Sequence, residues 1–133
     1  MDTTQTQSKV NMLVAHPWHG IEPYPKGAKE QNGMSPDKVC GFIEMTPSSD
    51  VKCEIDKVSG HLSIDRPQKY TNFLPCLYGF IPQTYCHTQV TRFACDAFKE
   101  QGLVPPDSLA GDHDPLDICV LTDRSPQMAN MIV

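Results

Sequence analysis

Three aspartates lie within six residues of one another at positions 112–117, where the sequence reads DHDPLD. An apolar run, ICVL at 118–121, follows directly and is typical of a strand. Carboxylates this close together repel one another unless a cation lies between them. Hard divalent cations such as Mg²⁺ prefer oxygen ligands and keep some of their water, which suits them to phosphate chemistry. The motif therefore predicts a metal site built for phosphoryl transfer.

The three carboxylates of this motif are expected to take different roles. Asp112 and Asp117 are the better metal-ligand candidates, and Asp114 between them could accept the proton of an attacking water. The alternative is a surface turn, because Asp and Pro are common turn residues. Like charges beside a buried strand would destabilise the fold without a cation, so we favour the metal site.

A second set of candidate residues comes from a strand-like segment. Residues 51–56, VKCEID, alternate apolar and polar side chains, which predicts a charged row of Lys52, Glu54 and Asp56 on one face. A solvated outer face would show the same pattern. The functional interpretation is favoured by four polar residues on flanking segments: Glu44, Arg66, Lys69 and Tyr78. Lys and Arg side chains bind phosphate oxygens, and a tyrosine hydroxyl can donate to an oxyanion.

The elements that must position these residues are short. Twelve prolines interrupt the 133-residue chain, which favours strands and turns over long helices. A hairpin is expected over 51–65, with Leu62 and Ile64 facing inward. Gly79 is expected to allow close backbone approach. Strands are predicted at 39–46, 51–56, 61–65 and 117–122, apolar segments at 72–82 and 128–133, and a short helix at 91–101 with Phe93, Ala97 and Phe98 on one side.

One domain is expected, over residues 39–133, preceded by a polar tail and irregular arm over 1–38. Short strands separated by turns fit a small β-barrel. Residues 16–21, HPWHGI, form a compact aromatic segment that we expect to pack onto the domain surface. Its two histidines are interpreted as packing and hydrogen-bonding groups, because no further metal ligands accompany them.

Composition argues against several classes of protein. The formal net charge is −5 and the pI is about 5.4, which makes nucleic acid a poor partner. Residues 1–9 lack the apolar core of a signal peptide and no apolar run reaches transmembrane length, so no membrane partner is expected. The six cysteines show no zinc-binding spacing and are interpreted as reduced thiols of a cytoplasmic protein; disulfides are the alternative.

The sequence resembles the soluble family I inorganic pyrophosphatases, notably their bacterial branch. Residues 112–117 match the family signature Asp-x-Asp-Pro-hydrophobic-Asp. The segment 16–20 is similar to an N-terminal extension in some bacterial members, and the whole resemblance covers roughly 39–123. Five more residues stand where the family keeps polar site residues: Glu44, Lys52, Glu54, Arg66 and Tyr78.

The resemblance implies a fold, a reaction and residue roles. The fold would be mainly β, an OB-like β-barrel with flanking helices, and the reaction Mg²⁺-dependent hydrolysis of pyrophosphate to two orthophosphates. By resemblance, Asp112 and Asp117 bind the metals and Asp114 orients or deprotonates the attacking water. The phosphate-holding residues would be Lys52, Arg66 and Tyr78, with Glu44 and Glu54 in the outer part of the site.

The sequence departs from the family at two points. His113 replaces a small residue; we expect an exposed turn side chain that tolerates an unusual backbone, the alternative being a pH-dependent charge near the metals. Family members also continue past Val133 with further strands, aspartates and lysines. We therefore expect an incomplete barrel with an open strand edge, so that the 133-residue chain alone is unstable and weakly active. Homo-oligomers are expected of the full-length form.

Three rival functions are weighed against pyrophosphate hydrolysis. A truncated pyrophosphatase that binds metal without activity shares every motif, and the sequence does not separate the two. OB-like barrels also bind single-stranded nucleic acid, but the net charge of −5 and the carboxylates argue against such a module here. A nucleotidase would need a base pocket, for which the sequence offers no candidate residues.

Overall fold

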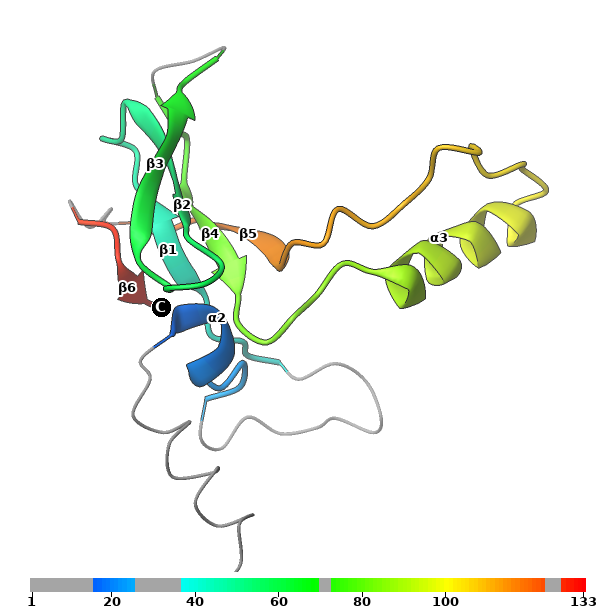
Figure 1. Ribbon diagram of the computed structural model, residues 1–133, viewed down its shortest axis with the longest axis horizontal. Coiled ribbons are helices and arrows are strands. Elements are labelled where there is room, and N and C mark those ends of the chain that lie inside the picture. Colours follow the sequence, from blue (N-terminus) through cyan, green and yellow to red (C-terminus); the bar gives the residue numbers. More distant parts are fainter. Residues whose placement is uncertain (1–15, 26–36, 70–72, 124–127) are drawn as a thin grey trace, which may run out of the picture.

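The computed structural model describes residues 16–25, 37–69, 73–123 and 128–133. Its elements in chain order are α2 (Pro17–Gly20), β1 (Phe42–Met45), β2 (Val51–Ile55), β3 (Leu62–Pro67), β4 (Leu77–Ile81), α3 (Thr88–Glu100), β5 (Leu116–Val120) and β6 (Met131–Ile132). The described strands form two antiparallel sheets (Figure 1), one with the order β5-β4-β1-β6 and one that pairs β2 with β3.

The prediction of a mainly β fold with an incomplete OB-like barrel is confirmed at the level of these sheets. Each predicted strand region overlaps an observed strand; β3 runs two residues beyond its predicted end, and β5 begins one residue before its predicted start. Within the described residues the four-stranded sheet stays open, because β5 and β6 are its two edges. The predicted helix is also present, and it begins at Thr88 rather than Thr91. Of the helices that the structure describes, none has the length and apolar character needed to span a bilayer.

The core lies where α2 meets the two sheets. Phe42 of β1 and Phe80 of β4 face each other with ring centroids 5.3 Å apart. Ile55 of β2 and Trp18 of α2 complete the same buried cluster. Burying one such side chain contributes about 1.5–3 kcal/mol, so the cluster joins both sheets and α2 into one body.

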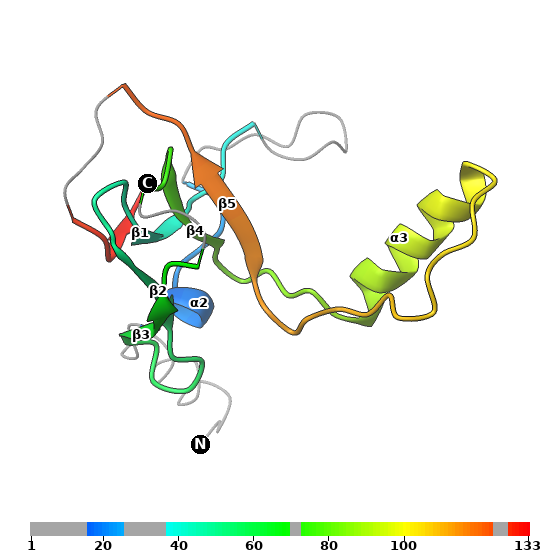
Figure 2. The ribbon, with the colours of Figure 1, turned by 90° about the horizontal axis from the view of Figure 1, so that it is seen from above.

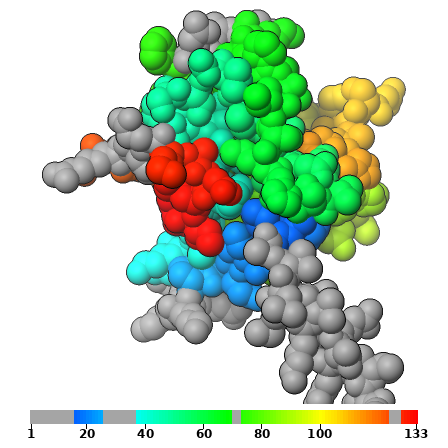
Figure 3. Space-filling model, turned by 60° about the vertical axis from the view of Figure 1, so that its left-hand side comes forward, coloured from blue at the N-terminus to red at the C-terminus, as the bar shows by residue number. Residues whose placement is uncertain are grey.

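The aromatic segment at 16–21 does not only cover the domain surface, because its Trp18 is part of the buried core. The Trp18 indole donates a hydrogen bond to the Thr84 carbonyl at 2.8 Å, and the Trp18 carbonyl accepts one from the Gln83 amide at 2.8 Å. His16 is buried, and its Nδ1 accepts from the Trp18 amide at 3.2 Å. The interpretation of His16 as a packing and hydrogen-bonding group is therefore confirmed. In the space-filling view α2, in blue, lies directly below the green β2–β3 turn (Figure 3).

One face prediction for the hairpin is wrong. Ile64 of β3 was expected to face inward, but its side chain is 71% exposed. The two-stranded sheet packs through β2, whose Ile55 is buried, while β3 is the outer strand and none of its residues is buried. Alternation separates two faces of a strand; it does not show which strand of a hairpin has a layer packed against it.

The predicted helix also lies in an unexpected place. Figures 1 and 2 both show α3 and the chain that follows it extending away from the two sheets. None of its residues is buried within the described structure, and Phe93 is 77% exposed. The apolar side of α3 therefore adds nothing to the core described above, and the candidate site is built without it.

Candidate active site

A cleft of about 240 Å³ lies where the two sheets, α2 and the acidic motif meet. Its apolar wall is Trp18, Ile55, Phe80 and Pro115. Its charged and polar lining is Glu44, Lys52, Glu54, Lys57, Tyr78, Asp112, Asp114 and Asp117. Seven of the eight residues that the resemblance assigns to the site therefore line one cavity, although they come from segments far apart in the chain. The exception is Arg66.

Glu44 lies at the bottom of the cleft on β1 and is only 5% exposed. The backbone N–H of Ile55 on β2 donates to its Oε1 at 2.8 Å, which ties β1 to β2. Burial raises the pKa of Glu44 to about 7; the Ile55 hydrogen bond opposes this rise, and the nearby charges of Glu54 and Asp117 add to it. Without a cation in the cleft, Glu44 therefore takes up a proton near neutral pH.

Replacing Glu44 by a residue that does not take up a proton should change how the free energy of unfolding depends on pH. Glu44 has a raised folded-state pKa, so folding takes up a proton between the unfolded value of 4.5 and about 7. The free energy of unfolding then falls as pH rises through that window, by about 1.4 kcal/mol per pH unit at most. We expect E44Q, whose amide oxygen can still accept from Ile55, to be more stable than the native chain by about 2–3 kcal/mol at pH 8 and by little at pH 4.

Urea unfolding at both pH values in EDTA measures this difference. The matched control is E100Q at the exposed end of α3, which should shift stability by less than about 0.5 kcal/mol at either pH. Equal effects of E44Q at pH 4 and pH 8 would contradict the assignment.

Lys52 and Glu54 lie two residues apart on β2, and their side chains contact each other on one face of the strand, as their spacing predicts. The Lys52 ammonium forms an ion pair with Glu54 and a second one, at 3.3 Å, with Asp65 of β3. Partial burial lowers the pKa of Lys52, but its bonds to Glu54 and Asp65 outweigh this and raise the pKa overall. Lys52 is thus a fixed positive charge at the edge of the cleft. Asp56, the third member of the predicted row, instead accepts from the Ser59 amide in the β2–β3 turn at 2.7 Å.

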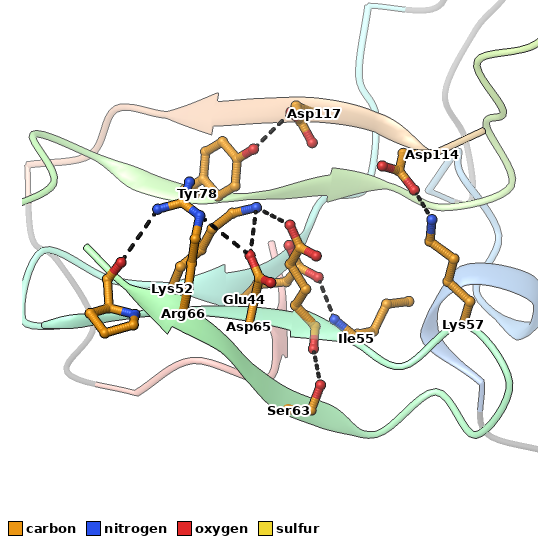
Figure 4. A network of polar contacts seen from close by, with 12 residues as sticks. Glu44, Lys52, Ile55, Lys57, Ser63, Asp65, Arg66, Tyr78, Asp114 and Asp117 are labelled. Carbon is orange, nitrogen blue, oxygen red and sulfur yellow. Dashed lines mark hydrogen bonds and ion pairs between the residues drawn. The ribbon is translucent and has the colours of Figure 1, made fainter. Parts of the chain in front are cut away.

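Arg66 lies at the rim of the site rather than in the cleft. It is the register partner of Lys52 across the β2–β3 pair. Its Nε is 3.7 Å from Asp65 Oδ2, and a terminal nitrogen donates to the Pro67 carbonyl at 3.4 Å. The Arg66 side chain is about half exposed. Figure 4 shows its guanidinium beside Lys52, so the side chain is close to the predicted phosphate site.

Tyr78 and Asp117 connect the neighbouring strands β4 and β5. The Tyr78 hydroxyl donates to Asp117 Oδ2 at 2.7 Å. Burial and, after it, the hydrogen bond and charge of Asp117 raise the pKa of Tyr78. The phenol is therefore a hydrogen-bond donor at every physiological pH, which suits it to binding an oxyanion.

A hydrogen bond between a side chain and a backbone amide within the acidic loop helps to fix its conformation before β5. Asp112 Oδ1 accepts from the Asp114 amide at 3.1 Å, and this bond chiefly lowers the pKa of Asp112. His113 between them has φ +65°, is exposed, and its Nδ1 lies 2.7 Å from the Tyr85 hydroxyl. The expectation that His113 is an exposed turn residue in an unusual backbone conformation is confirmed.

The same loop is joined to the segment that precedes α3. The Cys86 amide donates to the Asp114 carbonyl at 2.8 Å, and the His113 amide donates to the Cys86 carbonyl at 3.0 Å. A Cβ on Gly111 would stand 2.5 Å from that Cys86 carbonyl oxygen, so only glycine allows this approach. These contacts hold the motif at the mouth of the cleft.

Lys57 is a cleft residue that the sequence reasoning missed. It follows β2 in the turn, and its ammonium group forms an ion pair with Asp114 (Figure 4). The available signal was its place directly after the alternating segment 51–56, since a turn residue at a strand end can reach a neighbouring loop.

The carboxylates of the cleft have the donor chemistry that Mg²⁺ requires. Five of the described lining residues are acidic and two are lysines, so a bound cation would offset an excess of negative charge. Their side chains are directed at internal partners, however: within the described residues no three Asp, Glu, His or Cys groups converge on one point as a metal site. The oxygen ligands therefore suit Mg²⁺, but in this structure the carboxylates point toward lysine, tyrosine and backbone N–H partners.

Comparisons with known proteins agree on one family. The sequence profile of the inorganic pyrophosphatases matches residues 41–133. The inorganic pyrophosphatase of Chlamydia muridarum is 40% identical over 126 residues, which are 95% of this chain and 54% of that protein. Soluble inorganic pyrophosphatase 3 of Arabidopsis thaliana is 31% identical over 109 residues, 82% of this chain and 36% of that protein.

A solved inorganic pyrophosphatase structure from Helicobacter pylori aligns with 71% of this chain and 41% of its own, at a TM-score of 0.47 and 30% identity. The chain spans about half the length of the bacterial relatives that it matches. The profile match alone covers most of the chain, and the cleft residues described above lie almost entirely within it. The chain belongs to the inorganic pyrophosphatase family.

Proposed function

We propose that this chain carries the active site of an inorganic pyrophosphatase that hydrolyses diphosphate to two orthophosphates with Mg²⁺. The observation that supports this most is the single cleft that brings together Lys52, Tyr78 and the acidic motif. Phosphate-binding cations and metal-binding carboxylates in one small cavity suit a short, highly charged substrate better than a large one.

The carboxylates of the cleft divide into three roles in this proposal. Asp112 and Asp117 would hold Mg²⁺, and Glu44 and Glu54 would act in the outer part of the site. Asp114 accepts the proton of the attacking water, provided that its carboxylate is released from Lys57. When bound, Mg²⁺ would offset the charge of the substrate and polarise its phosphorus–oxygen bonds.

The substrate would be held by Lys52, Arg66 and Tyr78. Lys52 supplies a compact positive charge, and Arg66 beside it supplies a planar donor group that matches a phosphate edge. Tyr78 donates its hydroxyl proton, as it already does to Asp117. Binding of diphosphate would replace the carboxylate partners that these groups have now.

The other parts of the proposal concern partners and location. An acidic cleft disfavours nucleic acid, and the full-length protein would form a homo-oligomer. A cytoplasmic location is supported by the cysteines, since all six are free in the structure.

Phosphate release from diphosphate is expected to require Mg²⁺ and to stop when EDTA is added. The measurement is orthophosphate production by the 133-residue chain, with AMP as the comparison substrate. Mg²⁺ binding is followed in parallel by fluorescence of Trp18, the single tryptophan, which lines the cleft. Release from AMP at a similar rate would favour a nucleotidase; Mg²⁺ binding with no release from either substrate would favour the inactive metal-binding fragment.

A further inference from the structure

Lys57 reaches the acidic motif from a different part of the chain. It lies in the turn between β2 and β3, yet its ammonium group pairs with Oδ1 of Asp114, 57 residues further on. Its side chain is about half exposed and lines the cleft. Figure 4 shows it extending from the turn toward the Asp114 carboxylate.

The backbone of Lys57 is held by hydrogen bonds, whereas its side chain is about half exposed and has Asp114 as its ion-pair partner. In the turn, the Gly60 amide donates to the Asp56 carbonyl at 2.7 Å, and Gly60 has φ +72°. His16 Nε2 lies 3.2 Å from the Lys57 carbonyl oxygen, so α2 supports the turn from below. A lysine stem of four carbons on a fixed backbone can redirect its charge within the cleft without a change of fold.

The charges around Lys57 explain its present partner. The other lysine of the cleft, Lys52, is already engaged by Glu54 and Asp65. Asp114, Asp112 and Glu54 all act to keep Lys57 protonated, Asp114 most strongly. Among the described lining residues Lys57 is therefore the cation that neutralises the acidic motif when no metal is bound.

We propose that Lys57 is a further substrate-binding residue, which serves as the counter-ion of Asp114 in the metal-free cleft and turns to a phosphate oxygen once a divalent cation has taken over that neutralisation. This inference rests on the proposed function. The same movement of the Lys57 side chain also frees the Asp114 carboxylate to accept a proton. One movement therefore makes Lys57 available to the substrate and Asp114 available to the attacking water.

Replacing Lys57 should change two affinities in opposite directions. Without its ammonium group, Mg²⁺ no longer competes with an internal cation, so we expect K57Q to bind Mg²⁺ about 3-fold more tightly. At saturating Mg²⁺, methylenediphosphonate, a diphosphate analogue that cannot be hydrolysed, loses one charged donor. We expect K57Q to bind it about 10-fold more weakly. A purely structural role for Lys57 would weaken both.

The test is isothermal titration calorimetry on the native 133-residue chain, K57Q, K57R and K99Q. K99Q is the matched control, because Lys99 is exposed on α3 and pairs with Asp96 at 3.6 Å, away from the cleft. Each protein is titrated with MgCl₂ and then, at saturating Mg²⁺, with methylenediphosphonate. K57R, which keeps the charge, should stay closer to the native chain than K57Q in both titrations, and circular dichroism confirms that each variant is folded.

Three results would decide between the claims. Opposite shifts in K57Q, absent in K99Q, support the inference. Native-like values for K57Q, or weaker binding of both ligands, overturn it and leave the proposed function standing. Failure of the native chain to bind either Mg²⁺ or the analogue defeats the proposed function, and the inference falls with it.

Discussion

Replacement of Asp114 by Asn is expected to lower kcat for diphosphate hydrolysis about 100-fold or more, with a much smaller effect on KM. The amide has the shape of the carboxylate but takes up no proton, and a positioned general base contributes about 10²–10⁴ in rate. The Asp114 backbone contacts would survive, because its amide donates to Asp112 and its carbonyl accepts from Cys86. The fold of the loop should therefore be retained.

The measurement is steady-state phosphate release at saturating Mg²⁺ by the native chain, D114N and D107N. Asp107 is exposed in the chain that follows α3 and does not line the cleft, so D107N should keep native kcat and KM. A D114N chain with kcat within about 3-fold of native would remove Asp114 from its proposed role. A change confined to KM would make Asp114 a binding residue instead.

Much of this site could be predicted because strand geometry is regular. The period of two on β2 places Lys52 and Glu54 on one face, and the sheet order brings β1 and β4 beside each other with Glu44 and Tyr78 at nearby positions. Asp117 is the second residue of β5 and reaches Tyr78 across the β4–β5 pair. Strand alternation therefore accounts for Lys52 and Glu54, whereas the family resemblance is what assigns Glu44 and Tyr78 to the site.

What could not be predicted depends on contacts distant in sequence. Lys57 lies in a turn, where strand alternation predicts no direction for its side chain. Its pairing with Asp114 depends on how the turn packs against the acidic loop in the folded chain. Ile64 follows the alternation but lies on the outer strand, where the described residues provide no layer to cover it. Arg66 is predicted to hold phosphate, but its bonds to Asp65 and Pro67 keep its side chain at the rim of the cleft.

The two sheet strands that carry Glu44 and Tyr78 can be this close only because residue 79 is glycine. Gly79 is paired with Ile43 across β1 and β4. A Cβ at this position would stand 1.8 Å from the Phe42 carbonyl oxygen and 2.9 Å from the Ile43 Cα. Both neighbours are backbone atoms, so no side-chain rotation can relieve the overlap, and the strands must separate.

Substitution of Gly79 by Ala is therefore expected to lower the free energy of unfolding by about 4 kcal/mol or more, beyond the usual cost of overpacking. The measurement is urea unfolding in EDTA, with G41A as the matched control. A Cβ on Gly41 would meet only the methyl groups of Ile118 and Val133 at 3.4 and 3.5 Å, an ordinary contact, so G41A should stay within about 1 kcal/mol of native. Because β1 and β4 bear Glu44 and Tyr78, G79A should also abolish the Mg²⁺-dependent change in Trp18 fluorescence. A stable G79A chain that keeps this response would show that the cleft does not depend on the close pairing of these strands.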